Sequence, residues 1–331
     1  MPARARLTSV DVCAGAGGLA LGLEAAGFEP VALVENDPKA CATLRANRPR
    51  WNVLELDLLD FDPEEHRYVY DADLLSAGLP RVKSNASVKR AEDRYEQELL
   101  RATIWLVPGI RPRAVLIENV PELVQSDAYA DIRGFVHEEL EHLGYRLHWQ
   151  VLNASGFGIP QDRKQGLLVA LRDDLADGFQ WPTPDPVPPQ TVGEALKKSM
   201  ASAGWPHAEA WADRACRIAP AIVGGSKNRG GADLGPTGTK RSWAALGVNG
   251  GSIGDEPPGP DFPWLPDGDP KLLPKLTVPQ VAVLQGMPTD WVLAGGKTSS
   301  YRQLGHACPP PMARAVGEAV ADALGGTSPL P

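Results

Sequence analysis

The first half of the chain carries hydrophobic runs that alternate with amphipathic stretches. Short apolar runs of strand length are centred on Val10, Leu33, Val53, Leu74, Val115, Leu147 and Leu168. Helical patterns lie between most of them. Strands that alternate with helices pair in parallel, because each helix carries the chain back across the sheet. The pattern over residues 7–172 therefore predicts an α/β fold with a doubly wound, mostly parallel, Rossmann-like sheet.

A change of pattern marks the end of this region. Residues 181–190 read WPTPDPVPPQ, and their five prolines cannot continue a helix or a strand. Residues 183–270 are rich in glycine and proline with little periodicity, whereas helical spacing returns after Lys275. Pro311–Leu324 has apolar residues at a spacing of four and predicts an amphipathic helix. We therefore expect a smaller, loop-rich second domain.

A glycine-rich turn follows the first predicted strand. Asp11 lies at the strand end, and Gly15, Gly17 and Gly18 allow a tight turn that leaves room for a ligand. The helix that follows is expected to end at Gly27. Open α/β sheets bind nucleotide-like ligands at such a turn. A glycine-rich turn alone can also be only a tight connection.

Acidic residues close the next two strands. The apolar run Pro30–Val34 ends at Glu35, and an acid in this position can accept both ribose hydroxyls of a nucleoside. Asp37 and Pro38 suit the N-cap and first position of the following helix, and Asp57 closes the third strand. The glycine-rich turn has no Lys-Ser/Thr pair, so the expected ligand is a nucleoside without a triphosphate.

Composition limits the class of protein and its partners. The chain has 331 residues, enough for one large domain with a smaller partner, and a formal net charge of −8. If the partner is a nucleic acid, the basic residues must therefore be concentrated in particular segments of the chain. Cys13, Cys41, Cys216 and Cys308 have no paired spacing, which argues against disulfides and a zinc site. No apolar run reaches membrane length, and we expect a cytoplasmic protein that binds neither metal nor membrane.

Several motifs together carry a family resemblance. The segments DVCAGAGG, VEND and ELDLLD lie within residues 11–60, followed by IENV at 117–120, GIPQDR at 158–163, LTVPQVAVLQGMPTDW at 276–291 and YRQLGHACPPP at 301–311. In this order the chain resembles, nearly end to end, the cytosine carbon-5 DNA methyltransferases of restriction-modification systems. The last two motifs are the most specific, because a generic Rossmann-like protein has neither.

The resemblance implies S-adenosylmethionine as the cofactor, with Glu35 on its ribose and Asp57 on its adenine amine. The cofactor-binding residues implied in this way are Asp11, Cys13, Ala14, Gly15, Gly17, Gly18, Leu19, Glu35, Asn36, Asp57, Leu58 and Ala307. It also implies a discontinuous cofactor domain, residues 1–181 with 276–331, in which the last helix packs on the first part of the chain. Residues 182–275 would form a target-recognition-like domain.

Catalysis in the resembling family requires three groups. A thiolate adds to carbon 6 of cytosine because carbon 5 alone is a poor nucleophile, and the base leaves the duplex to be reached. Glu118 and Arg163 match the acid and the arginine that assist at the ring, although Gln165 replaces a second arginine of that motif. Glu118 could instead cap a helix, and Arg163 could form a surface ion pair.

The thiol is missing from its expected position. Arg81 follows Leu-Pro after the fourth strand, where the resembling family has cysteine, and Val82, Lys83 and Ser84 replace the aromatic and proline residues that follow. Arginine stays protonated, has no lone pair to add to carbon 6 and is bulkier than a thiol. The resemblance places none of the four cysteines where it could attack a flipped base.

Basic residues gather in two segments, one that follows the fourth strand from Arg81 and one at residues 217–241. The DNA-binding residues inferred from these segments are Lys83, Lys89, Arg90, Arg217, Lys227, Arg229, Lys240 and Arg241. Both segments could instead be solvated loops. His306 replaces the asparagine of the last motif, which indicates a local change of hydrogen bonding.

Three hypotheses remain open. The leading one is a protein of this architecture that binds S-adenosylmethionine and double-stranded DNA but lacks the standard cysteine-dependent route. The second is an active methyltransferase that uses non-covalent chemistry on a nucleic acid or nucleotide, with Glu118 as the base. The third is a non-enzymatic DNA-binding or partner subunit that works with an active enzyme.

Overall fold

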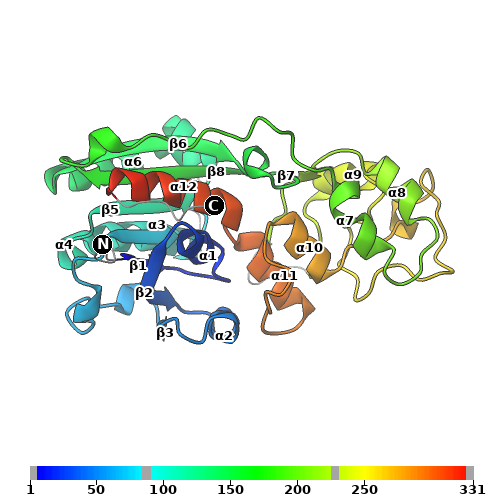
Figure 1. Ribbon diagram of the computed structural model, residues 1–331, viewed down its shortest axis with the longest axis horizontal. Coiled ribbons are helices and arrows are strands. Elements are labelled where there is room, and N and C mark those ends of the chain that lie inside the picture. Colours follow the sequence, from blue (N-terminus) through cyan, green and yellow to red (C-terminus); the bar gives the residue numbers. More distant parts are fainter. Residues whose placement is uncertain (1–5, 84–90, 225–230, 326–331) are drawn as a thin grey trace, which may run out of the picture. The chain divides into compact units, whose positions relative to one another are not determined.

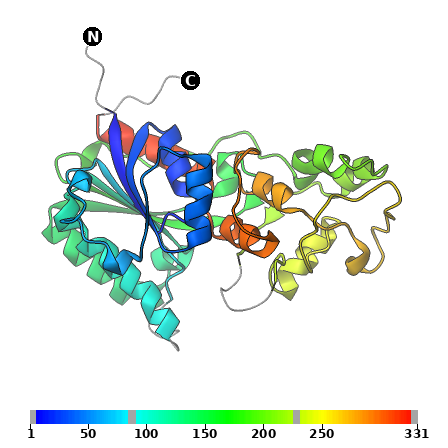
Figure 2. The same ribbon diagram turned by 90° about the horizontal axis from the view of Figure 1, so that it is seen from below.

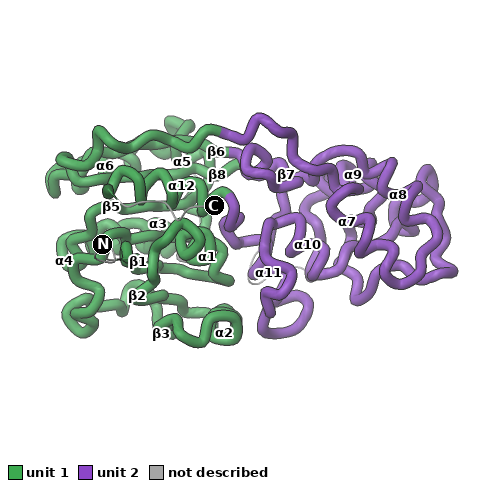
Figure 3. Tube along the Cα trace, viewed as in Figure 1, with its two compact units in different colours: residues 1–152, 164–183, 312–331 green, residues 153–163, 184–311 purple. Residues whose placement is uncertain are grey.

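The structure is a computed structural model that describes residues 6–83, 91–224 and 231–325. The chain forms two compact units, each discontinuous in sequence (Figure 3). Unit 1 comprises residues 1–152, 164–183 and 312–331, and unit 2 comprises residues 153–163 and 184–311. The large sheet lies in unit 1, and the loop-rich region with its short helices lies in unit 2.

Unit 1 is built on a seven-stranded sheet with the order β3-β2-β1-β4-β5-β8-β6 (Figure 1). Its strands are β1 (Leu7–Val12), β2 (Phe28–Glu35), β3 (Val53–Glu55), β4 (Leu74–Gly78), β5 (Ala114–Asn119), β6 (Tyr145–Asn153) and β8 (Lys164–Arg172). Strands β1 to β5 pair in parallel, and β8 runs antiparallel to β5. The predicted doubly wound, mostly parallel sheet is confirmed. Because the order reverses between β1 and β4, the segments that follow these strands meet at one edge.

Helices cover both faces of this sheet, with α1 and α12 on one face and α3, α4 and α6 on the other (Figure 2). Their bounds are α1 (Gly18–Ala25), α2 (Pro38–Asn47), α3 (Ala91–Trp105), α4 (Val107–Ile110), α5 (Pro121–Gln125), α6 (Ala130–His142) and α12 (Pro310–Ala323). Asp37 caps α2 through the Lys39 N–H, as the sequence predicts. None of the helices in the described ranges has the length and apolar character of a membrane span.

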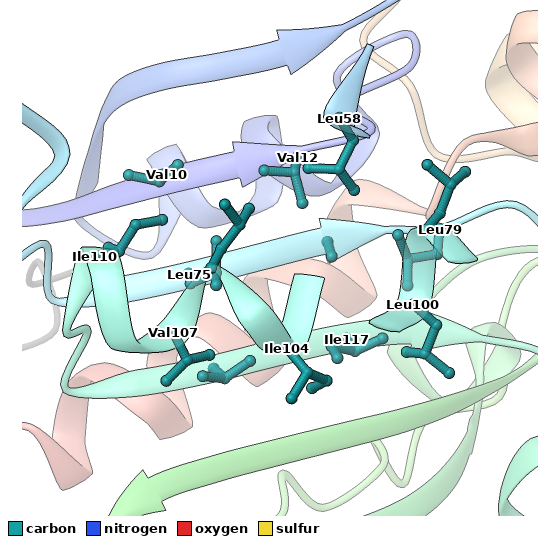
Figure 4. Packing of buried hydrophobic residues seen from close by; sticks show 14 of the residues in the cluster. Val10, Val12, Leu58, Leu75, Leu79, Leu100, Ile104, Val107, Ile110 and Ile117 are labelled. Atoms are coloured by element: carbon teal, nitrogen blue, oxygen red, sulfur yellow. The ribbon is translucent and has the colours of Figure 1, made fainter. Parts of the chain in front are cut away.

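An apolar core fills the space between the sheet and helices α3 and α4 (Figure 4). Val10 and Val12 of β1 belong to it together with Leu75 of β4, Ile104 of α3 and Ile117 of β5. Side chains alternate along a strand, so Asp11 points to the opposite face. The hydrophobic period of β1 thus fixes where its one acid lies.

The last helix packs against the first. Met312, Val316 and Val320 of α12 are buried, in agreement with the predicted amphipathic pattern. Gly317 allows α1 to come close, because a Cβ atom there would lie 2.8 Å from the Ala26 Cβ and 2.9 Å from a Leu23 methyl carbon. The expected return of this helix to the first part of the chain is confirmed.

Unit 2 contains short elements joined by long loops. They are β7 (Gln161–Asp162), β9 (Ala219–Pro220), α7 (Val192–Met200), α8 (Ala208–Arg214), α9 (Thr237–Ala245), α10 (Val278–Leu284) and α11 (Lys297–His306). Residues 276–311 belong to this unit, although the sequence assigned them to the cofactor domain. These residues pack with the rest of unit 2, because Gln280 of α10 donates to the Ser199 hydroxyl of α7 at 3.2 Å and contacts the Met200 sulfur.

Candidate functional site

The glycine-rich turn after β1 has a left-handed backbone at three positions. The φ angles of Cys13, Gly15 and Gly17 are 53°, 54° and 85°. Glycine adopts this conformation easily, whereas a cysteine does so against its steric preference. A Cβ atom at Gly15 would lie in open space, and Gly17 has no side chain with which to cap the first N–H groups of α1. The turn therefore leaves its backbone accessible to a ligand.

Glu35, at the end of β2, is fixed beside this turn. Its Oε2 accepts from the Gly15 N–H and its Oε1 from the Asp37 N–H, both at 2.7 Å. Burial raises the pKa of the Glu35 carboxyl group, and these two N–H groups act in the opposite direction. A carboxylate oxygen can accept more than one hydrogen bond, so this arrangement suits the paired hydroxyls of a ribose.

Asp57, after β3, is held by donors from three parts of unit 1. Its Oδ1 accepts from the Leu59 N–H at 3.0 Å, and its Oδ2 accepts from the Asn36 amide at 2.9 Å. The Tyr95 hydroxyl of α3 also donates to Oδ2. Burial, and then this hydrogen bond, raise the pKa of Tyr95, so its hydroxyl remains a donor at neutral pH.

Asp11 is fully buried on β1. The Ser76 hydroxyl of β4 donates to its Oδ1 at 2.9 Å, whereas Oδ2 has no hydrogen-bond partner among the described residues. The pKa of Asp11 is raised to about 7, mainly by burial. The hydrogen bond from Ser76 acts to lower the pKa, and the nearby Glu35 charge acts to raise it. A buried carboxyl oxygen without a donor is a position that a ligand or water can satisfy.

The loop after β4 is anchored by its backbone. The Asn119 side chain, at the end of β5, accepts from the Val82 N–H and donates to the Pro80 carbonyl, each at 3.1 Å. The Tyr129 hydroxyl donates to the Val82 carbonyl at 3.2 Å. The position of this loop is therefore set by contacts that do not involve the side chain of residue 81.

The side chains beside this anchor differ in exposure. Glu118, which directly precedes Asn119, is buried and lies opposite Gly78 in the parallel pairing of β4 with β5. Arg81 and Lys83 are exposed. The structure therefore brings Glu118 and the loop that carries Arg81 to neighbouring strand ends, and the Arg81 side chain does not fill a buried space.

The four cysteines lie in different environments. In unit 1, burial and then the charge of Glu35 raise the thiol pKa of Cys13, and the same two causes raise that of Cys41 to about 12. The Cys41 thiol also donates to the Glu35 carbonyl. In unit 2, Cys308 is buried and Cys216 is exposed. Thiols with a raised pKa stay protonated, so neither cysteine of unit 1 is activated as a nucleophile.

Arg163 follows β7 in unit 2 and is only 4% exposed. Its Nη1 donates to the carbonyls of Ile222 at 2.6 Å and Gly305 at 3.2 Å. This burial excludes a surface ion pair, the alternative that the sequence left open. Gln165, at the position of the second arginine, is buried in β8 of unit 1.

The basic residues inferred to bind DNA occur in both units. Lys83 is exposed in unit 1, and Arg217 and Arg241 are exposed in unit 2. Lys240 instead pairs with Asp233 at 3.1 Å, which offsets part of the positive charge of its segment. The residues that lie outside the described ranges are Lys89, Arg90, Lys227 and Arg229.

The remaining cofactor candidates divide between the units. Ala14, Gly18, Leu19 and Leu58 are buried in unit 1. Ala307 is buried in unit 2, where its N–H donates to the Gln303 carbonyl and its carbonyl accepts from the Gln285 amide. His306, beside it, is exposed. A cofactor contact of Ala307 stays a prediction.

Three residues were not predicted from the sequence to hold this site. Ser76 could have been found, because the pairing of β1 with β4 sets it opposite Asp11. Asn119 lies inside a recognised motif, but its bonds to the loop depend on the tertiary structure. Tyr95 follows a divergent segment, and nothing in its spacing indicates Asp57.

The sheet order and the acids at its strand ends define a class I methyltransferase fold. Two solved structures agree with this class. One is described as a prophage-encoded DNA modification methyltransferase (E. coli), with a TM-score of 0.68, 21% identity and coverage of 96% of this chain and 99% of that one. The other is the Dnmt2 methyltransferase of S. pombe, with a TM-score of 0.62, 15% identity and coverage of 97% and 99%.

Sequence comparison gives the family. Residues 7–322 match the C-5 cytosine-specific DNA methylase family, and the chain belongs to it. It is 44% identical to the type II methyltransferase M.NaeI of Lentzea aerocolonigenes over 96% of this chain and 75% of that protein. It is 38% identical to the type II methyltransferase M.NgoMIV of Neisseria gonorrhoeae over 96% of this chain and 98% of that protein.

Cytosine carbon-5 methyltransferases use S-adenosylmethionine. The residues of unit 1 fit this group, because a Cβ atom at Gly15 would lie in open space, the Glu35 carboxylate has oxygens that can accept from hydroxyls, and the Oδ2 atom of Asp11 is buried without a donor among the described residues. Across the described part of the chain, no three or more His, Cys, Asp or Glu side chains are grouped to hold a metal ion.

Proposed function

We propose that this chain binds S-adenosylmethionine and double-stranded DNA but does not methylate cytosine through a thiolate at position 81. The observation that carries the proposal is the exposed Arg81 in the anchored loop after β4, next to the buried Glu118. Glu35, Asp57 and the glycine-rich turn are all present in the same unit. These residues support binding of the cofactor, while the loop after β4 has no thiol to attack carbon 6.

The covalent route needs a sulfur atom in this loop. A thiolate gives an electron pair to carbon 6, so that carbon 5 can accept the methyl group that S-adenosylmethionine supplies. Loss of the carbon-5 proton then releases the thiolate. The Arg81 guanidinium has no electron pair to give at neutral pH. Cys13 and Cys41 do not replace it, because both thiols have a raised pKa.

The other predicted roles do not require a thiol. In this proposal Glu118 hydrogen-bonds a ring nitrogen of a flipped base. The role predicted for Arg163, binding of a base carbonyl oxygen, stays a prediction. The exposed cations Lys83, Arg217 and Arg241 bind phosphates, which gives affinity without reading sequence. Support for DNA as the partner comes from the family to which the chain belongs.

Methyl transfer without a covalent intermediate is a second candidate function. The observation that favours it is Glu118, a buried carboxyl group at a strand end. It could take a proton from an exocyclic amine while the amine nitrogen attacks the methyl group directly. The names of M.NaeI and M.NgoMIV describe methyltransferases and agree with either chemistry.

Product analysis separates these functions. The protein is incubated with methyl-labelled S-adenosylmethionine and unmethylated genomic DNA, and the hydrolysed nucleosides are analysed by mass spectrometry. We expect no 5-methylcytosine from the natural chain, together with calorimetric binding of S-adenosylhomocysteine and salt-dependent binding of DNA. A methylated exocyclic amine would select the second candidate. Binding without any product fits our proposal and includes a role as the DNA-binding subunit of a partner enzyme.

The decisive controls concern sulfur. Arg81→Cys returns a thiol to the anchored loop, and a gain of 5-methylcytosine in this variant would show that only the sulfur was missing. Formation of 5-methylcytosine by the natural chain would contradict the proposal. In that event, single Cys→Ser variants of Cys13, Cys41, Cys216 and Cys308 identify which thiol acts.

A further inference from the structure

The Asp57 carboxylate is oriented from three directions. The Leu59 N–H holds Oδ1, the Asn36 amide holds Oδ2, and the Tyr95 hydroxyl also donates to Oδ2. Leu59 lies in the turn that follows Asp57, whereas Asn36 follows β2 and Tyr95 lies on α3. Donors on separate elements prevent the carboxylate from turning about its own side-chain bonds.

Tyr95 is the more constrained of the two side-chain donors. Its ring is half-buried and packs against the core between the sheet and α3, so the core, and not a flexible stem, places the hydroxyl. The Asn36 amide is exposed, although it also contacts the Tyr95 hydroxyl at 3.3 Å. Only two χ angles place a tyrosine hydroxyl, so little entropy is lost when a ring packed in this way forms a hydrogen bond.

We propose that Tyr95 is a positioning residue that makes the cofactor site selective for a 6-amino purine, because it prevents Asp57 from turning. The inference rests on the proposed contact between Asp57 and the adenine amine. Adenine offers a donor at its 6-amino group, whereas hypoxanthine carries a carbonyl there and a donor N–H at the adjacent ring nitrogen. A carboxylate held in one orientation accepts only from the first. A carboxylate that can turn also accepts from the second.

The test compares two ligands that differ only in this group. Calorimetry gives the Kd of S-adenosylhomocysteine and of S-inosylhomocysteine for the natural chain, for Tyr95→Phe and for Tyr68→Phe. Tyr68 is an exposed tyrosine of unit 1 whose hydroxyl hydrogen-bonds the His66 ring, and it controls for loss of a phenol hydroxyl. We expect the natural chain and Tyr68→Phe to prefer the adenosyl ligand by the same ratio. We expect Tyr95→Phe to reduce that ratio by about tenfold, a change typical of losing a hydrogen bond to a charged group.

A second variant distinguishes positioning from general damage. In an Asp57→Asn background the ratio is already low, and Tyr95→Phe should then change it by less than about twofold, because its effect acts through the carboxylate. Thermal unfolding of each variant checks that the fold is retained.

The outcomes separate this inference from the proposed function. If the natural chain binds neither ligand, the proposed cofactor site fails and Tyr95 is irrelevant. If the natural chain prefers the adenosyl ligand and Tyr95→Phe keeps the full ratio, the inference is wrong while the cofactor site stands. Equal weakening of both ligands by Tyr95→Phe would also overturn it, because that result describes a structural role only.

Discussion

The edge of the sheet in unit 1 that carries Gly15, Glu35 and Asp57, the proposed cofactor edge, is held by hydrogen bonds, as is the loop after β4. The two regions differ in which groups these bonds hold. At the edge, backbone N–H groups hold the carboxylates themselves, such as that of Glu35 at 2.7 Å. In the loop, Asn119 and Tyr129 hold the backbone of residues 80–83, and the exposed side chain at the centre is Arg81. The comparison shows that anchoring of the loop is independent of residue 81. The hydrogen bonds that hold the loop therefore give no information on whether residue 81 can act as a nucleophile.

Removing the carboxylate at the cofactor edge should have the largest effect. Glu35→Ala takes away the acceptor for the Gly15 and Asp37 N–H groups and, in the proposed cofactor site, for the ribose hydroxyls. We expect the Kd for S-adenosylhomocysteine to rise about a thousandfold, or about 4 kcal/mol, as for two hydrogen bonds to a charged group. Calorimetry measures this. Glu29→Ala, an exposed acid on the same strand, is the control and should leave the Kd unchanged.

The buried acid of β1 should make stability depend on pH. The pKa of Asp11 is raised from 3.8 to about 7 in the folded chain, so the folded state binds this proton more tightly than the unfolded state. Its contribution is therefore full below about pH 4 and is lost as the pH rises towards 7. Between pH 5 and 7.5 we expect a loss of about 3 kcal/mol that Asp11→Asn removes. Urea unfolding at the two pH values measures this loss. An equal change in the free energy of unfolding for the natural chain and for Asp11→Asn would contradict the prediction.

The loop anchor can be tested without touching the cofactor edge. Asn119→Ala removes the bonds to the Val82 N–H and the Pro80 carbonyl, and we expect a loss of about 2 kcal/mol in the free energy of unfolding. The Kd for S-adenosylhomocysteine should stay within about twofold, because these bonds lie outside the proposed cofactor contacts. Asn52→Ala, whose exposed amide donates to the Val31 carbonyl, is the matched control with a smaller loss. A cofactor affinity that falls with Asn119→Ala would show that the two regions are coupled.

Several parts of unit 1 could be predicted from short stretches of the sequence. The β1 strand, its glycine-rich turn and the Asp37 cap follow from hydrophobic period, backbone freedom and side-chain length, all of which are written in a few neighbouring residues. Glu35 and Asp57 could be placed because parallel strands bring their carboxyl ends to one edge. The family resemblance added the nature of the ligand, which the pattern alone left at a nucleoside.

Contacts between distant residues could not be predicted in this way. The Tyr95 hydroxyl reaches Asp57 across 38 positions of the chain, and Gln280 reaches Ser199 across 81. The latter contact helps to place residues 276–311 in unit 2, against the expected division. Lys240, a predicted DNA-binding cation, pairs with Asp233 only seven positions away, but this pairing too depends on how the segment folds. Such pairings depend on packing, which a one-dimensional pattern does not contain.

The smallest expected effect concerns Arg81 itself. If the exposed guanidinium binds one phosphate, Arg81→Ala should weaken DNA binding about two- to fivefold at moderate salt and reduce the slope of log affinity against log salt by about one. Arg50→Ala, an exposed arginine that precedes β3 at the opposite end of the strands, should change neither quantity. Fluorescence anisotropy with a labelled duplex over a range of salt concentrations gives both values. An unchanged slope would mean that the exposed Arg81 makes no phosphate contact, and the anchored loop after β4 would then add nothing to DNA affinity through this side chain.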